Sequence, residues 1–137
     1  MTMSKIVAID SNIFLYALDT TLTPKGEKAL HLILDNDAIF STQVLSEVVN
    51  VCQKRWKFSK EQLIKVVEFL LRNSTLVGFD DTTVLKAHNL TKRYDFQYFD
   101  ALIVAAALNA NCTILYTEDM HHGLVVEGIL TILNPFK

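Results

Sequence analysis

The chain alternates short apolar runs with longer segments of helical periodicity. Ile6–Ile9 is a continuous apolar run, typical of a central strand that is covered on both faces of a sheet. Further β-rich segments follow at residues 38–40, 75–79, 113–116 and 129–133. Strands that alternate with helices are typical of parallel sheets, so the pattern predicts a three-layer α/β/α sandwich with a parallel sheet of about five strands.

Several helix-start signals lie between these strands. Thr23 before Pro24 is typical of an N-cap with proline at the first helical position. Ser59 and Gln62 have the spacing of a capping box. Other caps are expected at Ser41 or Thr42 and at Asp80 or Asp81.

The most apolar helix is predicted to begin at Asp100. The next eight residues, 101–108, are all apolar, so this helix is expected to be buried on nearly every side. Eight is also the longest apolar run in the chain, whereas a membrane-spanning helix needs roughly 18 residues or more. The sequence therefore predicts no membrane segment.

Length and composition favour one domain spanning residues 1–137. The chain has 50% apolar and 20% charged residues, a balance typical of soluble proteins. Its two cysteines, Cys52 and Cys112, lie in apolar stretches and are interpreted as reduced, buried thiols of a cytoplasmic protein. The net charge of -2 argues weakly against a nucleic-acid partner, unless bound metal neutralises some of the acids.

Four acids change that picture by their positions. Asp10 follows the first strand, Asp119 the fourth, and Asp100 stands at the start of the apolar helix; Glu47 lies one turn into the helix after the second strand. Singly, each aspartate is as readily a helix cap, and Glu47 a solvated helix residue. Together, at the carboxyl ends of one parallel sheet, they would repel each other unless cations bound there.

Carboxylate-rich oxygen sites of this kind suit Mg²⁺ or Mn²⁺. Setting the four acids aside leaves 11 of the 15 acidic residues against 13 basic ones, a balance of +2. The chemistry that such a site supports is metal-assisted hydrolysis of a phosphodiester. The sequence has neither a glycine-rich phosphate loop nor a serine nucleophile elbow to suggest another reaction.

Four segments of the chain resemble the PIN-domain nucleases, and most closely the bacterial VapC-type toxins. They are residues 6–14, 43–50, 98–107 and 115–120, in that order and covering nearly the whole chain. The resemblance implies endonucleolytic cleavage of single-stranded RNA with Mg²⁺ or Mn²⁺. It also implies a homodimer that a small antitoxin holds inactive by lying across the groove near the early helices.

Residue by residue, the resemblance assigns the family's four metal-binding and catalytic acids to Asp10, Glu47, Asp100 and Asp119. Asp10, Asp100 and Asp119 would hold the ion that activates water, and Glu47 would contribute to a second ion or orient water. Asn12 matches the polar residue that steadies the first acid. Thr117 matches the hydroxyl residue that hydrogen-bonds near the fourth acid, whereas Glu118 has no assigned role.

A basic segment with interleaved aromatics is a candidate for RNA contact. Lys54, Arg55 and Lys57 surround Trp56, an arrangement that suits phosphate pairing and base stacking. Cations at a helix C-terminus also offset the helix dipole, which is the alternative interpretation. His121 and His122 are interpreted as exposed or loop-packing residues, because adjacent histidines seldom face one ion.

Two further aromatics and the apolar faces of two predicted helices are candidates for a homodimer interface. Tyr98 and Phe99 are interpreted as core or interface residues. The apolar positions of two predicted helices exceed what one sheet obviously covers, which predicts a homodimer through part of that surface. These positions are Val44, Val48, Leu63, Val67, Leu70 and Leu71.

Three other functions remain open. One is a housekeeping RNA-processing enzyme with the same acids. The second is a non-catalytic α/β binding module in which the acids are helix caps. The third is a phospho-receiver domain, for which Asp80 follows the third strand; such a domain should have paired acids after its first strand, but Ser11 follows Asp10.

Overall fold

The computed structural model describes residues 5–21 and 23–137 and confirms the α/β class. The strands are β1 (Ile6–Ile9), β2 (Asp37–Ser41), β3 (Ser74–Val77), β4 (Ile114–Tyr116), β5 (Val125–Val126) and β6 (Leu130–Leu133). The helices are α1 (Ser11–Leu18), α2 (Pro24–Leu34), α3 (Thr42–Lys54), α4 (Lys60–Asn73), α5 (Asp81–Tyr94) and α6 (Tyr98–Asn109).

The strands form one sheet in the order β3-β2-β1-β4-β6-β5. All neighbouring pairs are parallel except β5 with β6, so the sheet is mostly rather than wholly parallel and has one strand more than the five expected. The extra strand β5 is two residues long and joins β6 through a tight hairpin. Glu127 and Gly128 both have positive φ there, which is the backbone of a type I′ turn.

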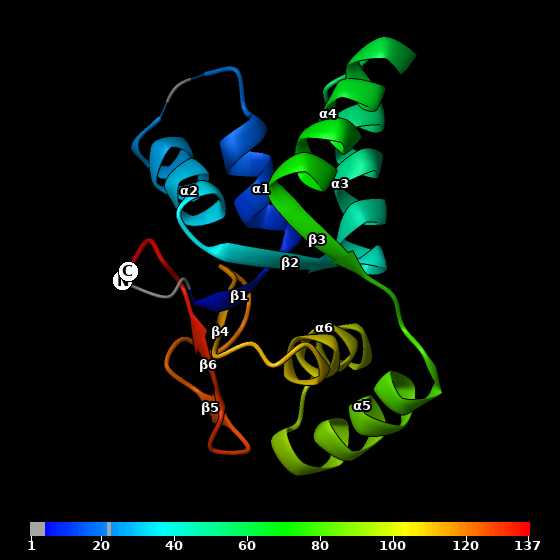
Figure 1. Cartoon of the computed structure of the whole chain (residues 1–137), viewed down its shortest axis with the longest axis vertical. Coiled ribbons are helices and arrows are strands. Elements are labelled where there is room, and N and C mark those ends of the chain that lie inside the picture. Colours follow the sequence, from blue (N-terminus) through cyan, green and yellow to red (C-terminus); the bar gives the residue numbers. More distant parts are fainter. Residues whose placement is uncertain (1–4, 22) are drawn as a thin grey trace.

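Helices cover both faces of the sheet. Figure 1 shows α1, α2, α3 and α4 on one side and α5 and α6 on the other, which gives the expected three layers. Residues 101–107 of α6 are all buried, because α6 is packed between the sheet and α5. In the described part of the chain, no helix has both the length and the apolar character needed to cross a membrane.

Local signals in the sequence account for most helix starts. Thr23 caps α2, Ser41 caps α3, Ser59 forms a complete capping box at α4, and Asp80 caps α5. Helix α6 differs, because it begins at Tyr98 with Gln97 as its N-cap. Asp100 is therefore the third helical residue, and its interpretation as a helix cap is wrong.

Three of the six apolar positions expected to form a dimer surface lie in the core of one chain, and Leu63 and Val67 are half-buried. Val44, Val48 and Leu70 are fully buried, because α3 and α4 pack against the sheet and each other. Leu71 is exposed on α4. A dimer could not use the three buried residues without unfolding, so any interface lies elsewhere or on the remaining exposed positions.

Candidate active site

The four acids come from four elements that meet at the carboxyl ends of the central strands. Asp10 follows β1 and caps α1, and its backbone N–H donates to the carbonyl of Tyr116 at the end of β4. Asp119 lies three residues beyond β4. Glu47 is in α3, which follows β2, and Asp100 is in the first turn of α6. The topology thus places them at one edge of the sheet, as expected for an open parallel sheet.

Asp10 is the most buried of the four acids, with 5% of its surface exposed. One carboxylate oxygen accepts a hydrogen bond from the backbone N–H of Ser11 at 2.7 Å. The other accepts from the hydroxyl of Thr117, also at 2.7 Å. Asp10 is therefore a helix cap and a member of the acid cluster at once, so the two interpretations are not exclusive.

Thr117 and Asn12 tie the loop after β4 to α1. The buried Thr117 hydroxyl donates to Asp10 and accepts from the backbone N–H of Asp119 at 3.1 Å. Asn12, expected beside the first acid, instead donates to the Asp119 carboxylate at 3.0 Å and accepts from the Glu118 N–H at 3.2 Å. The two supporting residues thus act across the sheet edge, with Thr117 on the first acid and Asn12 on the fourth.

Glu47 is held by two residues that sequence reasoning missed. The Ser11 hydroxyl donates to one carboxylate oxygen at 2.6 Å, and the Gln43 amide donates to the other at 3.0 Å. Gln43 could have been found, because it lies four residues before Glu47 on the same helix face. Ser11 could not, because only the packing of α1 on α3 brings it to Glu47.

Glu118 faces away from the acid cluster. Its carboxylate accepts from the Tyr16 hydroxyl at 2.7 Å and pairs with Lys25 at 2.8 Å. These contacts lower the pKa of Glu118. The loop therefore separates two adjacent acids, one neutralised by a lysine and the other, Asp119, turned toward Asn12.

The charges of the cluster act on one another. Burial, with smaller contributions from the charges of Glu47 and Asp119, raises the pKa of Asp10 to about 6 against the lowering effect of its two hydrogen bonds. Burial raises the pKa of Asp100 as well, and Asp119 and Glu47 add to the rise. None of the ion pairs in residues 5–21 and 23–137 involves these four acids. The cluster is thus negative and without a cationic side-chain partner in the described chain.

The donor set fits a hard divalent ion in its chemistry. It offers carboxylate oxygens, the ligands that Mg²⁺ and Mn²⁺ take. Gln43 Oε1, next to Glu47, is also a buried acceptor without a hydrogen-bond donor among the described residues. As the side chains stand, no three His, Cys, Asp or Glu of the described chain lie close enough together to hold one ion. Asp119 is exposed and Asp100 is half-buried.

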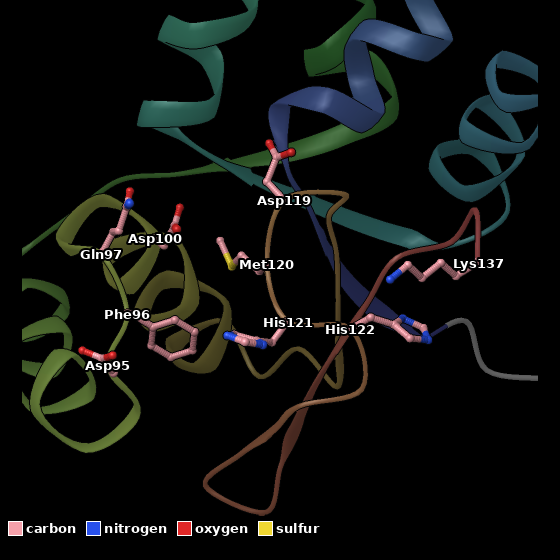
Figure 2. A pocket seen from close by; sticks show the side chains of 9 residues that line it. All are labelled: Asp95, Phe96, Gln97, Asp100, Asp119, Met120, His121, His122 and Lys137. Atoms are coloured by element: carbon pink, nitrogen blue, oxygen red, sulfur yellow. The ribbon is translucent and has the colours of Figure 1, made fainter.

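A cavity of about 800 Å³ opens beside the cluster. Asp100 and Asp119 line it together with residues from the α5–α6 turn and the loop after Asp119 (Figure 2). His121 and His122 are exposed, as expected. His122 accepts a hydrogen bond from the backbone N–H of Asn134 at 2.9 Å, which fits a loop-packing role.

The basic segment lies at the end of α3. Lys54 is the last helical residue, Arg55 is the C-cap, and Lys57 follows with a positive φ of 56°. Arg55 and Trp56 line a second cavity, of about 240 Å³, together with Asn12. One lining residue, Asn12, also hydrogen-bonds to Asp119 of the acid cluster.

The chain is a mostly parallel α/β/α sandwich that carries four acids at the carboxyl ends of its central strands. The PIN domain family model matches residues 7–124, and the chain belongs to this family. No curated protein is similar enough in sequence to count as a relative.

Solved structures with the same fold come from several bacteria. A toxin–antitoxin complex from Klebsiella pneumoniae matches with a TM-score of 0.69 and 17% identity, over 94% of this chain and 97% of that one. VapC20 of Mycobacterium tuberculosis, a sarcin–ricin loop cleaving toxin, matches with a TM-score of 0.63 and 16% identity, over 82% of this chain and 91% of that one. VapBC2 of Rickettsia felis, bound to a promoter DNA fragment, matches with a TM-score of 0.62 and 21% identity, over 83% of this chain and 88% of that one. At these identities the likeness establishes the fold alone.

Proposed function

We propose that this protein is a divalent-metal-dependent endoribonuclease that cuts single-stranded RNA. The observation that carries the proposal is the gathering of Asp10, Glu47, Asp100 and Asp119 at one sheet edge, with raised pKa values at Asp10 and Asp100 and no cationic partner in the described chain. Perturbed carboxylates beside a cavity are a recognised sign of a functional site. Membership of the PIN family supports the same conclusion.

In this proposal Asp10, Asp100 and Asp119 hold Mg²⁺ or Mn²⁺, and Glu47 contributes to a second ion or orients water. The ion, when bound, supplies the positive charge that activates water and stabilises the leaving oxygen. The protein's own residues orient the carboxylates through hydrogen bonds. Thr117 and the Ser11 N–H fix both oxygens of Asp10, Asn12 fixes Asp119, and Ser11 and Gln43 fix Glu47.

We further propose that the protein is the toxin of a toxin–antitoxin pair that acts in the cytoplasm. Its structural neighbours include a toxin–antitoxin complex and an RNA-cleaving toxin, which supports a small antitoxin as partner. The two free, buried cysteines fit a reducing compartment. A housekeeping RNA-processing role would use the same acids, and a neighbouring small reading frame for an antitoxin distinguishes the two.

A homodimer is part of the proposal, through Tyr98 and Phe99 rather than through the buried positions of α3 and α4. Tyr98 and Phe99, at the start of α6, are 43% and 66% exposed, so they are interface candidates rather than core residues. Leu85 on the adjoining helix α5 is exposed as well, and the His88 ring packs against Tyr98. Sedimentation at micromolar concentration tests this; a 15.5 kDa species alone excludes the dimer.

RNA contact by Lys54, Arg55 and Lys57 is also proposed. Arg55 lines a cavity together with Asn12, which hydrogen-bonds to Asp119, so one of these cations lies near the acid cluster. Cationic side chains near a carboxylate cluster would hold the phosphates that the cluster itself repels.

The deciding experiment incubates the purified protein with mixed single-stranded RNA, with and without Mn²⁺, and maps the new ends. We expect internal cuts that require the ion. Calorimetric titration with Mn²⁺ runs alongside it. A protein that neither binds Mn²⁺ above background nor cuts RNA is a binding module, and the proposal is then wrong.

A further inference from the structure

The larger cavity contains more than the two acids, and the proposed metal chemistry leaves its other walls unexplained. Besides Asp100 and Asp119, it is lined by Phe96 and Gln97 from the turn before α6, and by Met120 and His121 from the loop after β4. Figure 2 shows these side chains around one space, with Asp100 and Asp119 at one end and Asp95 at the other. A volume of about 800 Å³ is ample for a nucleoside and its phosphates.

The side chain of Gln97 makes no hydrogen bond within the described chain. It is the N-cap residue of α6, yet its side chain makes no capping hydrogen bond. Ser, Thr, Asp or Asn would stabilise the helix there. The amide is instead exposed, and in Figure 2 it projects from the start of α6 in the same direction as the carboxylate of Asp100.

The turn before Gln97 is built to place it there. Asp95 ends α5 in the left-handed conformation, with φ 57°, and Phe96 is buried against the core. The chain thus reverses in three residues, which brings the start of α6 to the cavity. Gln97, the N-cap, and Asp100, three residues later, then lie next to each other at the start of α6.

The opposite wall is flat and partly apolar. His121 is exposed, its side chain makes no hydrogen bond within the described chain, and Figure 2 shows its ring directed toward Phe96. Met120 lies half-buried beside it. An imidazole and a thioether next to a phenyl ring form the kind of surface on which an unstacked base packs.

We propose that this cavity binds the nucleoside next to the scissile phosphate and reads its base. Gln97 would hydrogen-bond the edge of the base, because its amide offers a donor and an acceptor side by side. His121 would stack on the face of the base. The inference rests on the proposed ribonuclease function for its reaction and adds the residue that sets base preference.

The test compares cut-site preferences on an RNA pool randomised around one cleavage position. Gln97→Leu keeps the size of the side chain and removes both hydrogen-bonding groups. We expect the preference at one position beside the cut to fall about 5- to 100-fold, the contribution of a good amide–base pair, while the melting temperature stays unchanged. Gln53→Leu, an exposed glutamine of α3 that lines neither cavity, is the matched control and should keep the wild-type preference.

A second arm does not depend on cleavage. RNA carrying 5-iodouridine is photo-crosslinked to the Asp10→Asn protein, and the attachment site is mapped by mass spectrometry. We expect crosslinks to His121, and their loss in a protein that also carries His121→Ala.

The two arms separate the possible failures. Wild-type protein that cuts RNA while Gln97→Leu leaves every preference unchanged overturns the base-reading role and spares the proposed nuclease. Protein that cuts no RNA but crosslinks in the cavity overturns the nuclease and retains the nucleoside site. Crosslinks confined to residues outside the cavity overturn the site itself.

Discussion

The acid cluster and the β5–β6 hairpin shift the pKa values of their carboxylates in opposite directions. On the hairpin, Glu127 lies 2.7 Å from Lys86 and 3.2 Å from Arg93, and these cations lower its pKa. In the cluster, burial and neighbouring acids raise the pKa of Asp10 and of Asp100. One acid is neutralised by the fold, and the others are brought together against their mutual repulsion.

The difference distinguishes a carboxylate that stabilises the fold through ion pairs from carboxylates that the fold only positions. Glu127 connects the hairpin to α5, because its ion pairs and the hydrogen bond from its N–H to the Tyr94 hydroxyl all reach that helix. Asp10 receives hydrogen bonds but no cation. A fold stabilised only by its own contacts would not gather such charges, so the cluster fits a site whose cation comes from solution.

The largest effect is expected from Asp100→Asn. The substitution removes one negative charge from a site proposed to bind a dication through charge, so Mn²⁺ affinity and RNA cleavage should fall at least a hundredfold. In metal-free buffer, stability should stay the same or rise, because repulsion by Asp119 and Glu47 is relieved. Cleavage assays with Mn²⁺ and urea unfolding in EDTA measure the two effects.

Asp81→Asn is the matched control, because Asp81 also lies in the first turn of a helix, α5, and is remote from the cluster. It should keep full cleavage and lose at most the helix-dipole contribution, about 0.3–1 kcal/mol. An Asp100→Asn protein that folds normally and cuts at the wild-type rate contradicts the proposed site.

The same contrast shows how far sequence alone reaches. The strand ends predicted that Asp10 and Asp119 lie at one edge, because parallel strands end at a common edge, whereas Asp100 and Glu47 were added from their places at or near helix starts. The sequence could not predict the hydrogen bond from Ser11 to Glu47 or the one from Asn12 to Asp119. Both depend on how α1 packs against α3 and the loop after β4. The hairpin was missed because β5 has only two residues and its turn uses Glu127, a residue with no preference for positive φ.

A smaller effect concerns pH. The pKa of Asp10 is raised to about 6 in the fold from an ordinary 3.8, so the native state binds its proton more tightly than the unfolded chain. The contribution of Asp10 to metal-free stability is therefore full below about pH 4 and declines as pH rises toward 6. The decline is on the order of 3 kcal/mol.

Asp10→Asn should remove that part of the pH dependence while preserving the cap, because asparagine caps as well as aspartate. Urea unfolding of both proteins in EDTA between pH 4 and 7 measures it. Equal slopes for the two proteins would show that Asp10 titrates normally in the fold. Excess Mn²⁺ at pH 7 should stabilise the wild type and leave Asp10→Asn nearly unchanged.

The smallest effect is expected on the hairpin, where Glu127→Gln makes the same neutral replacement in the opposite setting. Here the folded pKa is lowered, so the contribution of Glu127 is present at pH 7 and is lost as pH falls below the ordinary glutamate value. The ion pairs lie near the surface, so the loss at pH 7 should be about 0.2–1 kcal/mol and should shrink in 1 M salt. Cleavage should be unaffected, because Glu127 lines neither cavity. Removing the charge should therefore lower the free energy of unfolding at Glu127 and raise it at Asp10. Urea unfolding of both variants in EDTA at pH 7 should give changes in that free energy of opposite sign. Shifts of the same sign would mean that the hairpin and the cluster do not differ in the way their pKa values indicate.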